Sequence, residues 1–201
     1  MKLPLFTRQQ IIPTWKHIAW PKGMGNWPYM NPGELESLLA VIGLSQHHDR
    51  MVEIGVNEGR TAKLVLDRFP FSSYIGIDVP PGYRPSKPIQ RQEVPATPGR
   101  HVKGDPRFRL LLMPNGSLDV SPGDVGVADV IFIDGDHGAR AVEHDSALAK
   151  KIVLPGGLII WHDYHHVGTV DVAPILERFA EEGRKIFHVE GTWIAFERIE
   201  T

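Results

Sequence analysis

The hydrophobic positions of this chain follow two spacings, which predict alternating helices and strands. Apolar residues at helical spacing mark residues 33–44, 59–68, 140–153 and 172–182. Short continuous apolar runs, typical of buried parallel strands, mark residues 51–56, 74–78, 108–113, 129–134 and 157–161. Two further runs, 185–189 and 193–198, flank Glu190-Gly191-Thr192 and predict a closing hairpin.

Alternating strands and helices predict an α/β domain, with a parallel sheet covered by helices on both faces. We expect one domain over residues 31–201, whose first helix starts at Asn31-Pro32, preceded by an N-terminal arm over residues 1–30. Residues 79–107 break the pattern, because seven prolines there exclude a long helix. This segment is predicted to be a loop or lid, with at most one turn at residues 90–93.

The amino-acid composition excludes several classes of function. The 201 residues carry a formal net charge of −2, which argues against a broad surface for nucleic acid or anionic membrane. The chain contains no cysteine, so disulfides, zinc–thiolate sites and cysteine nucleophiles are excluded. No apolar run reaches the length of a signal peptide or a membrane span. We expect a soluble, cytoplasmic protein, and we allow for a homo-oligomer.

Two acids and two glycines suggest a nucleoside site at the ends of the first two predicted strands. Glu53, Gly55, Asn57 and Gly59 lie in a strand–turn–helix sequence, where glycine lets a ligand approach the backbone and the helix offers free N–H groups. Asp78 ends the next strand, where a carboxylate can accept ribose hydroxyls. The alternatives are a corner that binds no ligand and an exposed acid at a strand end.

Polar residues also follow the fourth and fifth predicted parallel strands. Asp134, Asp136 and His137 follow one, and His162 and Asp163 follow the other. The ends of adjacent parallel strands share one sheet edge, so carboxylates and imidazoles there could bind a divalent metal. The alternative is that the acids cap helices and contact solvent. Four other histidines, at positions 101, 144, 165 and 166, are expected at the surface or in supporting roles.

These motifs resemble the class I S-adenosylmethionine-dependent methyltransferases. The phrases FIDGDH and LPGGLIIWHDY look most like the small-methyltransferase branch of cephalosporin-hydroxylase-like and macrolide sugar O-methyltransferases, which is related to the catechol O-methyltransferases. The resemblance covers roughly residues 33–78 and 108–198 and implies a Rossmann-like, seven-stranded sheet of order 3-2-1-4-5-7-6.

The resemblance also implies roles for individual residues. S-adenosylmethionine is expected to contact Glu53, Gly55, Gly59 and Asp78, with Ser117 near the adenine and Asp134 near the methionine moiety. In the catechol-type enzymes, one acid and an adjacent acidic/amide pair hold a metal. The matching residues are Asp134, His162 and Asp163, so Mg²⁺ or another divalent ion is a candidate cofactor. The histidine departs from the family pattern and would suit a softer ion than magnesium.

The resulting hypothesis is metal-assisted O-methylation of a small-molecule hydroxyl. His137 matches the basic lysine of the catechol-type enzymes and is the candidate base. A metal-free enzyme of the same fold, a nicotinamide oxidoreductase and a non-catalytic nucleoside-binding relative are the alternatives. The dinucleotide fingerprint Gly-x-Gly-x-x-Gly is absent, which disfavours the oxidoreductase. The fold alone does not decide among the remaining ones.

Overall fold

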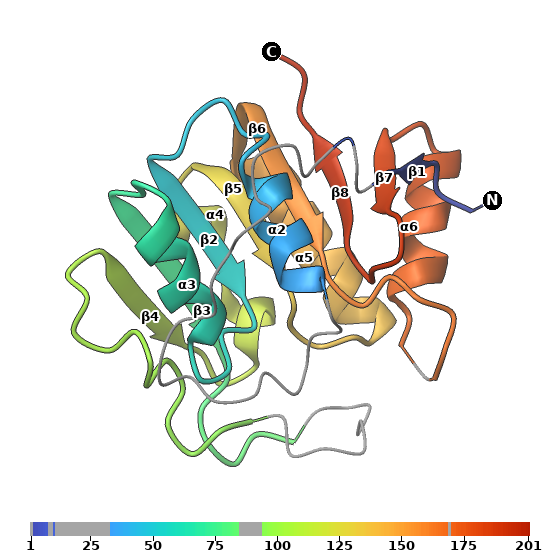
Figure 1. Ribbon diagram of the computed structural model, residues 1–201. Helices are drawn as coiled ribbons and strands as arrows, with labels where there is room; N and C mark the ends of the chain where they lie inside the picture. Colours follow the sequence, from blue (N-terminus) through green and yellow to red (C-terminus); the bar gives the residue numbers. More distant parts are fainter. Residues whose placement is uncertain (1, 8–9, 11–32, 85–93, 169) are drawn as a thin grey trace.

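The computed structural model describes residues 2–7, 10, 33–84, 94–168 and 170–201 (Figure 1). The predicted helix start at Asn31-Pro32, the turn at residues 90–93 and most of the predicted N-terminal arm lie outside these ranges. The described strands are β1 (Leu5–Phe6), β2 (Arg50–Ile54), β3 (Ser73–Asp78), β4 (Phe108–Leu112), β5 (Ala128–Ile133), β6 (Val153–Trp161), β7 (Ile186–Val189) and β8 (Ala195–Arg198). The described helices are α2 (Glu34–Ile42), α3 (Arg60–Arg68), α4 (Pro122–Val125), α5 (Ala139–Ile152) and α6 (Val172–Glu181), with a 3₁₀ turn at Gly116–Asp119.

The strands form one mixed sheet in the order β1-β7-β8-β6-β5-β2-β3-β4. The α/β class and the mostly parallel sheet are confirmed, with β8 antiparallel to β6 and β7. The predicted seven-stranded sheet is wrong, because β1 adds an eighth strand, which pairs in parallel with β7 at one edge. Across the sheet, strands β2 to β8 lie side by side in the order β4-β3-β2-β5-β6-β8-β7. Two residues, Leu5 and Phe6, are too few to give a periodic signal in the sequence.

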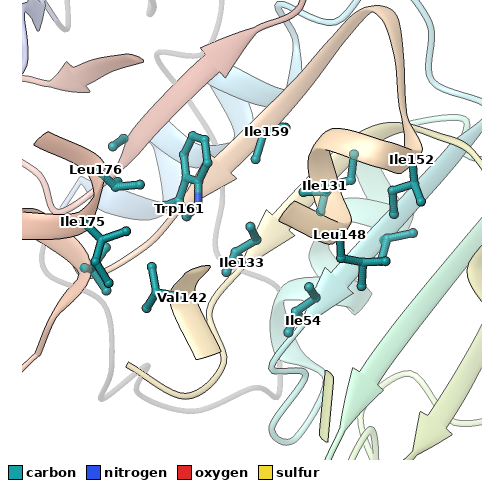
Figure 2. Close-up of a cluster of buried hydrophobic side chains, with 14 of the residues drawn as sticks. Ile54, Ile131, Ile133, Val142, Leu148, Ile152, Ile159, Trp161, Ile175 and Leu176 are labelled. Atoms are coloured by element: carbon teal, nitrogen blue, oxygen red, sulfur yellow. The ribbon is translucent and has the colours of Figure 1, made fainter. Parts of the chain in front are cut away.

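Two apolar layers cover the sheet, one on each face. Side chains alternate along β5, so that Val130 and Phe132 join the core with α2 and α3. Ile131 and Ile133 point the other way, into the core with α4, α5 and α6. Figure 2 shows this second core, in which Trp161 of β6 lies between the residues of α5 and α6. The continuous apolar runs in the sequence therefore reflect strands buried on both faces.

Polar residues gather where the parallel strands end. The connections that follow β2, β3, β5 and β6 lie at the lower edge of the sheet in Figure 1. The described parts of the proline-rich segment, residues 79–84 and 94–107, contain neither helix nor strand. Within the described ranges, no helix has the length and apolarity needed to cross a bilayer. The polar residues at this edge lie in loops that the sheet holds in place.

Candidate active site

The connection from β2 to α3 is packed tightly against the end of β5. Gly55 has φ 90°, and a Cβ there would lie 2.0 Å from the carbonyl oxygen of Asp134. A backbone hydrogen bond agrees with this contact, since the N–H of Asp134 donates to the carbonyl of Ile54. From the sequence, a glycine at this position was expected to let a ligand approach the backbone closely. The structure shows that the chain's own backbone makes that approach.

The N-terminus of α3 is covered by residues 99–102. Gly59 caps the helix with φ 80°, and a Cβ at this position would lie 2.9 Å from the Val102 side chain. Glu58 secures the segment, because its carboxylate pairs with Arg100 at 2.6 Å and its carbonyl accepts the N–H of His101. Part of the proline-rich region is therefore fixed to the loop expected to bind the cofactor.

Asp78 ends β3 beside this loop. Its carboxylate accepts the backbone N–H of Asn57 at 2.6 Å and that of Val79 at 2.7 Å. Burial raises its pKa above the ordinary value, against the lowering effect of these backbone donors. The backbone of Val56 makes a third hydrogen bond to this carboxylate. A carboxylate has about four lone-pair positions, so about one remains for a hydroxyl donor. The acid is thus held in one orientation and suits a ribose.

Glu53 lies deeper than a residue that contacts a ligand directly. It is 1% exposed, and its carboxylate accepts the Tyr74 hydroxyl at 3.0 Å. Burial raises its pKa well above the ordinary value, although the Tyr74 hydrogen bond lowers it, and the charges of Asp134 and Asp78 raise it further. The structure therefore places Glu53 beneath the site.

Replacing Glu53 with glutamine is expected to stabilise the protein increasingly as pH rises. The folded state keeps a proton that the unfolded chain loses above about pH 4.5, so the free energy of unfolding of the wild type falls with pH in that window. The advantage of Glu53→Gln should grow by about 1.4 kcal/mol per pH unit until the folded-state carboxyl ionises. Urea unfolding from pH 4 to 8 measures it. The same substitution at exposed Glu190 is the control, and parallel pH profiles for both variants would contradict the assignment.

The polar residues after β5 and β6 do meet. One ligand atom each from Asp134, His162 and Asp163 lies within 4.8 Å of the others. Nδ1 of His162 is 3.2 Å from Oδ1 of Asp134 and 3.4 Å from Oδ2 of Asp163. His162 is 4% exposed, whereas both carboxylates are partly accessible. The predicted metal-binding trio therefore forms one compact cluster.

Two more histidines contact the same aspartate. Nε2 of His137 lies 2.6 Å from Oδ2 of Asp163, and Nε2 of His165 lies 3.6 Å from Oδ1. The ring of His165 also packs on Trp193, with centroids 4.1 Å apart. Asp171 secures the loop that carries His137, because its N–H donates to the His137 carbonyl. Asp163 is thus the shared anion of an imidazole cluster.

The acids and histidines of this cluster shift one another's pKa values. Burial lowers the pKa of His162, but Asp134, Asp163 and Glu34 raise it, and the net result is well above the ordinary value. Burial raises the pKa of Asp163, but the contacts with His137 and His162 lower it to a net value below the ordinary one. Two carboxylates and one imidazole are suitable donors for a first-row divalent ion or magnesium. The donor set therefore fits a divalent ion, and in its absence the imidazoles balance the acids.

Ser117, expected near an adenine, lies in the 3₁₀ turn after β4 and is 8% exposed. Its hydroxyl bonds to Asp145 of α5, a buried carboxylate whose pKa burial raises. The Oδ2 atom of Asp145 also lies 3.6 Å from the Cβ position of Gly135, in the loop after β5. Asp145 therefore bonds to the turn that carries Ser117 and lies near the loop after β5.

Reasoning from sequence missed one residue of the site, Glu34, and named His165 only among the histidines expected at the surface or in supporting roles. Glu34 is fully buried and lies 3.5 Å from His162, yet it opens α2, far away in the sequence. One signal existed: Glu34 precedes Leu38 by four residues and so lies on the apolar face of the helix. No spacing marked His165, because it lies in an irregular loop.

Comparisons with known proteins agree with this arrangement. The family profile described as "Methyltransferase domain" matches residues 52–164, more than half of the chain. An uncharacterised protein of Acanthamoeba polyphaga mimivirus is 31% identical over 114 residues, which are 56% of this chain and 50% of that protein. The chain thus matches about half the length of this curated relative.

Solved structures support the fold. The O-methyltransferase NovP superposes with a TM-score of 0.60 at 15% identity, over 84% of this chain and 80% of that one. A precorrin-6y C5,15-methyltransferase from Geobacter metallireducens gives 0.57 at 12% identity, over 83% and 89%. The family match makes S-adenosylmethionine the expected cofactor. The chain belongs to the methyltransferase domain family.

Proposed function

We propose that this enzyme methylates a hydroxyl of a small molecule with the help of a divalent metal ion. The observation that carries the proposal is the cluster of Asp134, His162 and Asp163, whose ligand atoms lie within 4.8 Å of one another. It lies at the carboxyl ends of β5 and β6, the edge where open α/β sheets bind ligands. NovP, an O-methyltransferase of the same fold, supports oxygen as the acceptor atom.

The proposed roles follow from the positions of the side chains. Asp78 would accept a ribose hydroxyl, Ser117 would lie near the adenine, and Asp134, His162 and Asp163 would hold the ion. S-adenosylmethionine supplies an activated methyl group, and a divalent ion, when bound, lowers the pKa of the acceptor hydroxyl and orients it. The chain itself aligns the acceptor oxygen about 3 Å from the methyl carbon, which removes most of the entropic barrier.

His137 is the proposed base. Its Nε2 lies 2.6 Å from Oδ2 of Asp163, close enough for an ion pair once the ring is protonated. When the ring accepts the proton of the acceptor hydroxyl, the Asp163 carboxylate stabilises the imidazolium that forms. The side chain is 14% exposed, which leaves it accessible to an acceptor.

A metal-free methyltransferase is the second candidate. Nδ1 of His162 lies 3.2 Å from Asp134 and 3.4 Å from Asp163, so a protonated His162 would balance both carboxylates without an ion. In that enzyme His137 alone would activate the acceptor. The two candidates bind S-adenosylmethionine alike and differ in their response to a chelator.

Replacing Asp78 with alanine is expected to weaken S-adenosylmethionine binding by about 1.5–3 kcal/mol, the usual contribution of a hydrogen bond to a charged group. That loss corresponds to roughly 10- to 150-fold in the dissociation constant. Titration calorimetry measures it, with exposed Asp67→Ala on α3 as the control. Equal affinity in Asp78→Ala and wild type would place the ribose elsewhere.

Turnover with and without metal tests the proposed function. Pools of small hydroxyl compounds are incubated with the enzyme and S-adenosylmethionine, and release of S-adenosylhomocysteine is measured. Metal-assisted transfer predicts that a chelator abolishes release and that Mg²⁺ or Mn²⁺ restores it. Release that a chelator does not change selects the metal-free enzyme. Tight cofactor binding with no release from any pool would contradict both.

A further inference from the structure

Glu34 is a buried carboxylate that the proposed roles do not use. It lies in the first turn of α2 and has no exposed surface. Its Oε1 accepts the backbone N–H of Trp193 at 2.6 Å, and its Oε2 lies 3.5 Å from Nε2 of His162. A carboxylate loses its hydration when it is buried, so its position needs an explanation in terms of the charges around it.

The ring of His162 lies between Glu34 and the two aspartates. Its Nδ1 faces Asp134 at 3.2 Å and Asp163 at 3.4 Å, while its Nε2 faces Glu34. Within the described ranges, Nε2 is a buried nitrogen that makes no hydrogen bond of good geometry, and the charged group next to it is Glu34. The two atoms are 3.5 Å apart, at the upper limit of a hydrogen bond, and both side chains are buried.

We propose that Glu34 is a positioning residue for the metal site. A histidine that binds a metal presents one ring nitrogen to the ion, and its other N–H commonly donates to a carboxylate, which fixes the tautomer and the ring orientation. Glu34 holds the proton on Nε2 of His162 and thereby directs the lone pair of Nδ1 toward Asp134 and Asp163. The contact with Trp193 fixes Glu34 in turn, so α2 and the turn between β7 and β8 both support the site.

This inference rests on the proposed metal site, and binding measurements test it without turnover. Titration calorimetry with Mn²⁺ is carried out on the wild type, Glu34→Gln and Glu36→Gln. Glutamine keeps an oxygen that can accept the N–H of Trp193 but removes the charge that faces His162. Glu34→Gln is expected to bind Mn²⁺ about 10- to 100-fold more weakly, the usual effect of losing such a partner. Glu36→Gln, the same change in the same helical turn, should bind like the wild type.

Two further readouts separate positioning from a general structural effect. S-adenosylmethionine affinity and melting temperature should be nearly equal in the wild type and Glu34→Gln. Nitrogen-15 NMR of histidine-labelled protein loaded with Zn²⁺ should find the His162 proton on Nε2, with the signal of a hydrogen-bonded N–H in the wild type and a shifted signal in Glu34→Gln. A proton on Nδ1 would overturn the inference.

The outcomes also distinguish this inference from the proposed function. Wild-type Mn²⁺ affinity in Glu34→Gln overturns the role of Glu34 and leaves the metal site intact. A wild type that binds no divalent ion overturns both the role of Glu34 and the metal-assisted mechanism, whereas S-adenosylmethionine titration reports separately on the cofactor site.

Discussion

Replacing Asp163 with glycine is expected to lower turnover by about 10²- to 10⁴-fold, the usual contribution of a positioned acid–base group. The change removes the carboxylate that lies 2.6 Å from His137 and 3.4 Å from His162. The proposed base loses its counter-ion and the proposed metal loses a ligand in one step. Glycine is the suitable replacement because Asp163 has φ 57°, a conformation in which alanine would add strain.

The control for this variant is cofactor binding. Asp78 and the Asn57 loop lie at the ends of β2 and β3, on the side of the expected cofactor, and they make no contact with Asp163 in the described hydrogen bonds. Titration calorimetry should therefore give nearly the same S-adenosylmethionine affinity for Asp163→Gly and wild type. Turnover at the wild-type rate would contradict the roles given to both Asp163 and His137.

Replacing Gly55 with alanine is expected to destabilise the protein by about 2–5 kcal/mol. Left-handed backbone costs an L-residue roughly 1–2 kcal/mol, and overpacking adds about 1–3 kcal/mol. The new Cβ would lie 2.0 Å from the carbonyl oxygen of Asp134 and 2.7 Å from the nitrogen of Gly135. Backbone atoms cannot rotate away as a side chain can, so β2 and β5 must separate at the site. Urea unfolding measures the change.

Gly82 provides a matched control. It has φ 91°, close to the φ 90° of Gly55, but no atom of the residues that the structure describes lies within 4 Å of its Cβ position. Gly82→Ala should therefore cost only the backbone part, about 1–2 kcal/mol. Similar losses in the two variants would show that the contact between Gly55 and Asp134 is unimportant.

The sequence could predict most of the sheet, because its central strands are buried on both faces. Runs such as Val130 to Ile133 read as strands without help from tertiary structure. It could not predict β1, whose two residues pair with β7 only after the chain has folded. The mistaken strand count thus came from the shortest element, where periodicity carries no information.

The sequence could predict the site residues that come directly after a strand. Asp134, His162 and Asp163 meet because β5 and β6 are parallel neighbours with a fixed register, in which Ile133 pairs with Trp161. Glu34 was not predictable in the same way, because only packing of α2 across the sheet brings it to His162. Long-range contacts of this kind leave no spacing rule in the sequence.

The most direct test of the metal-assisted account is a crystal grown with S-adenosylhomocysteine and soaked with Mn²⁺. The account predicts nucleoside density with its ribose on Asp78, and an anomalous peak between Asp134, His162 and Asp163. Nucleoside density with no anomalous peak, together with turnover that a chelator does not affect, would contradict the metal and leave His137 to activate the acceptor alone.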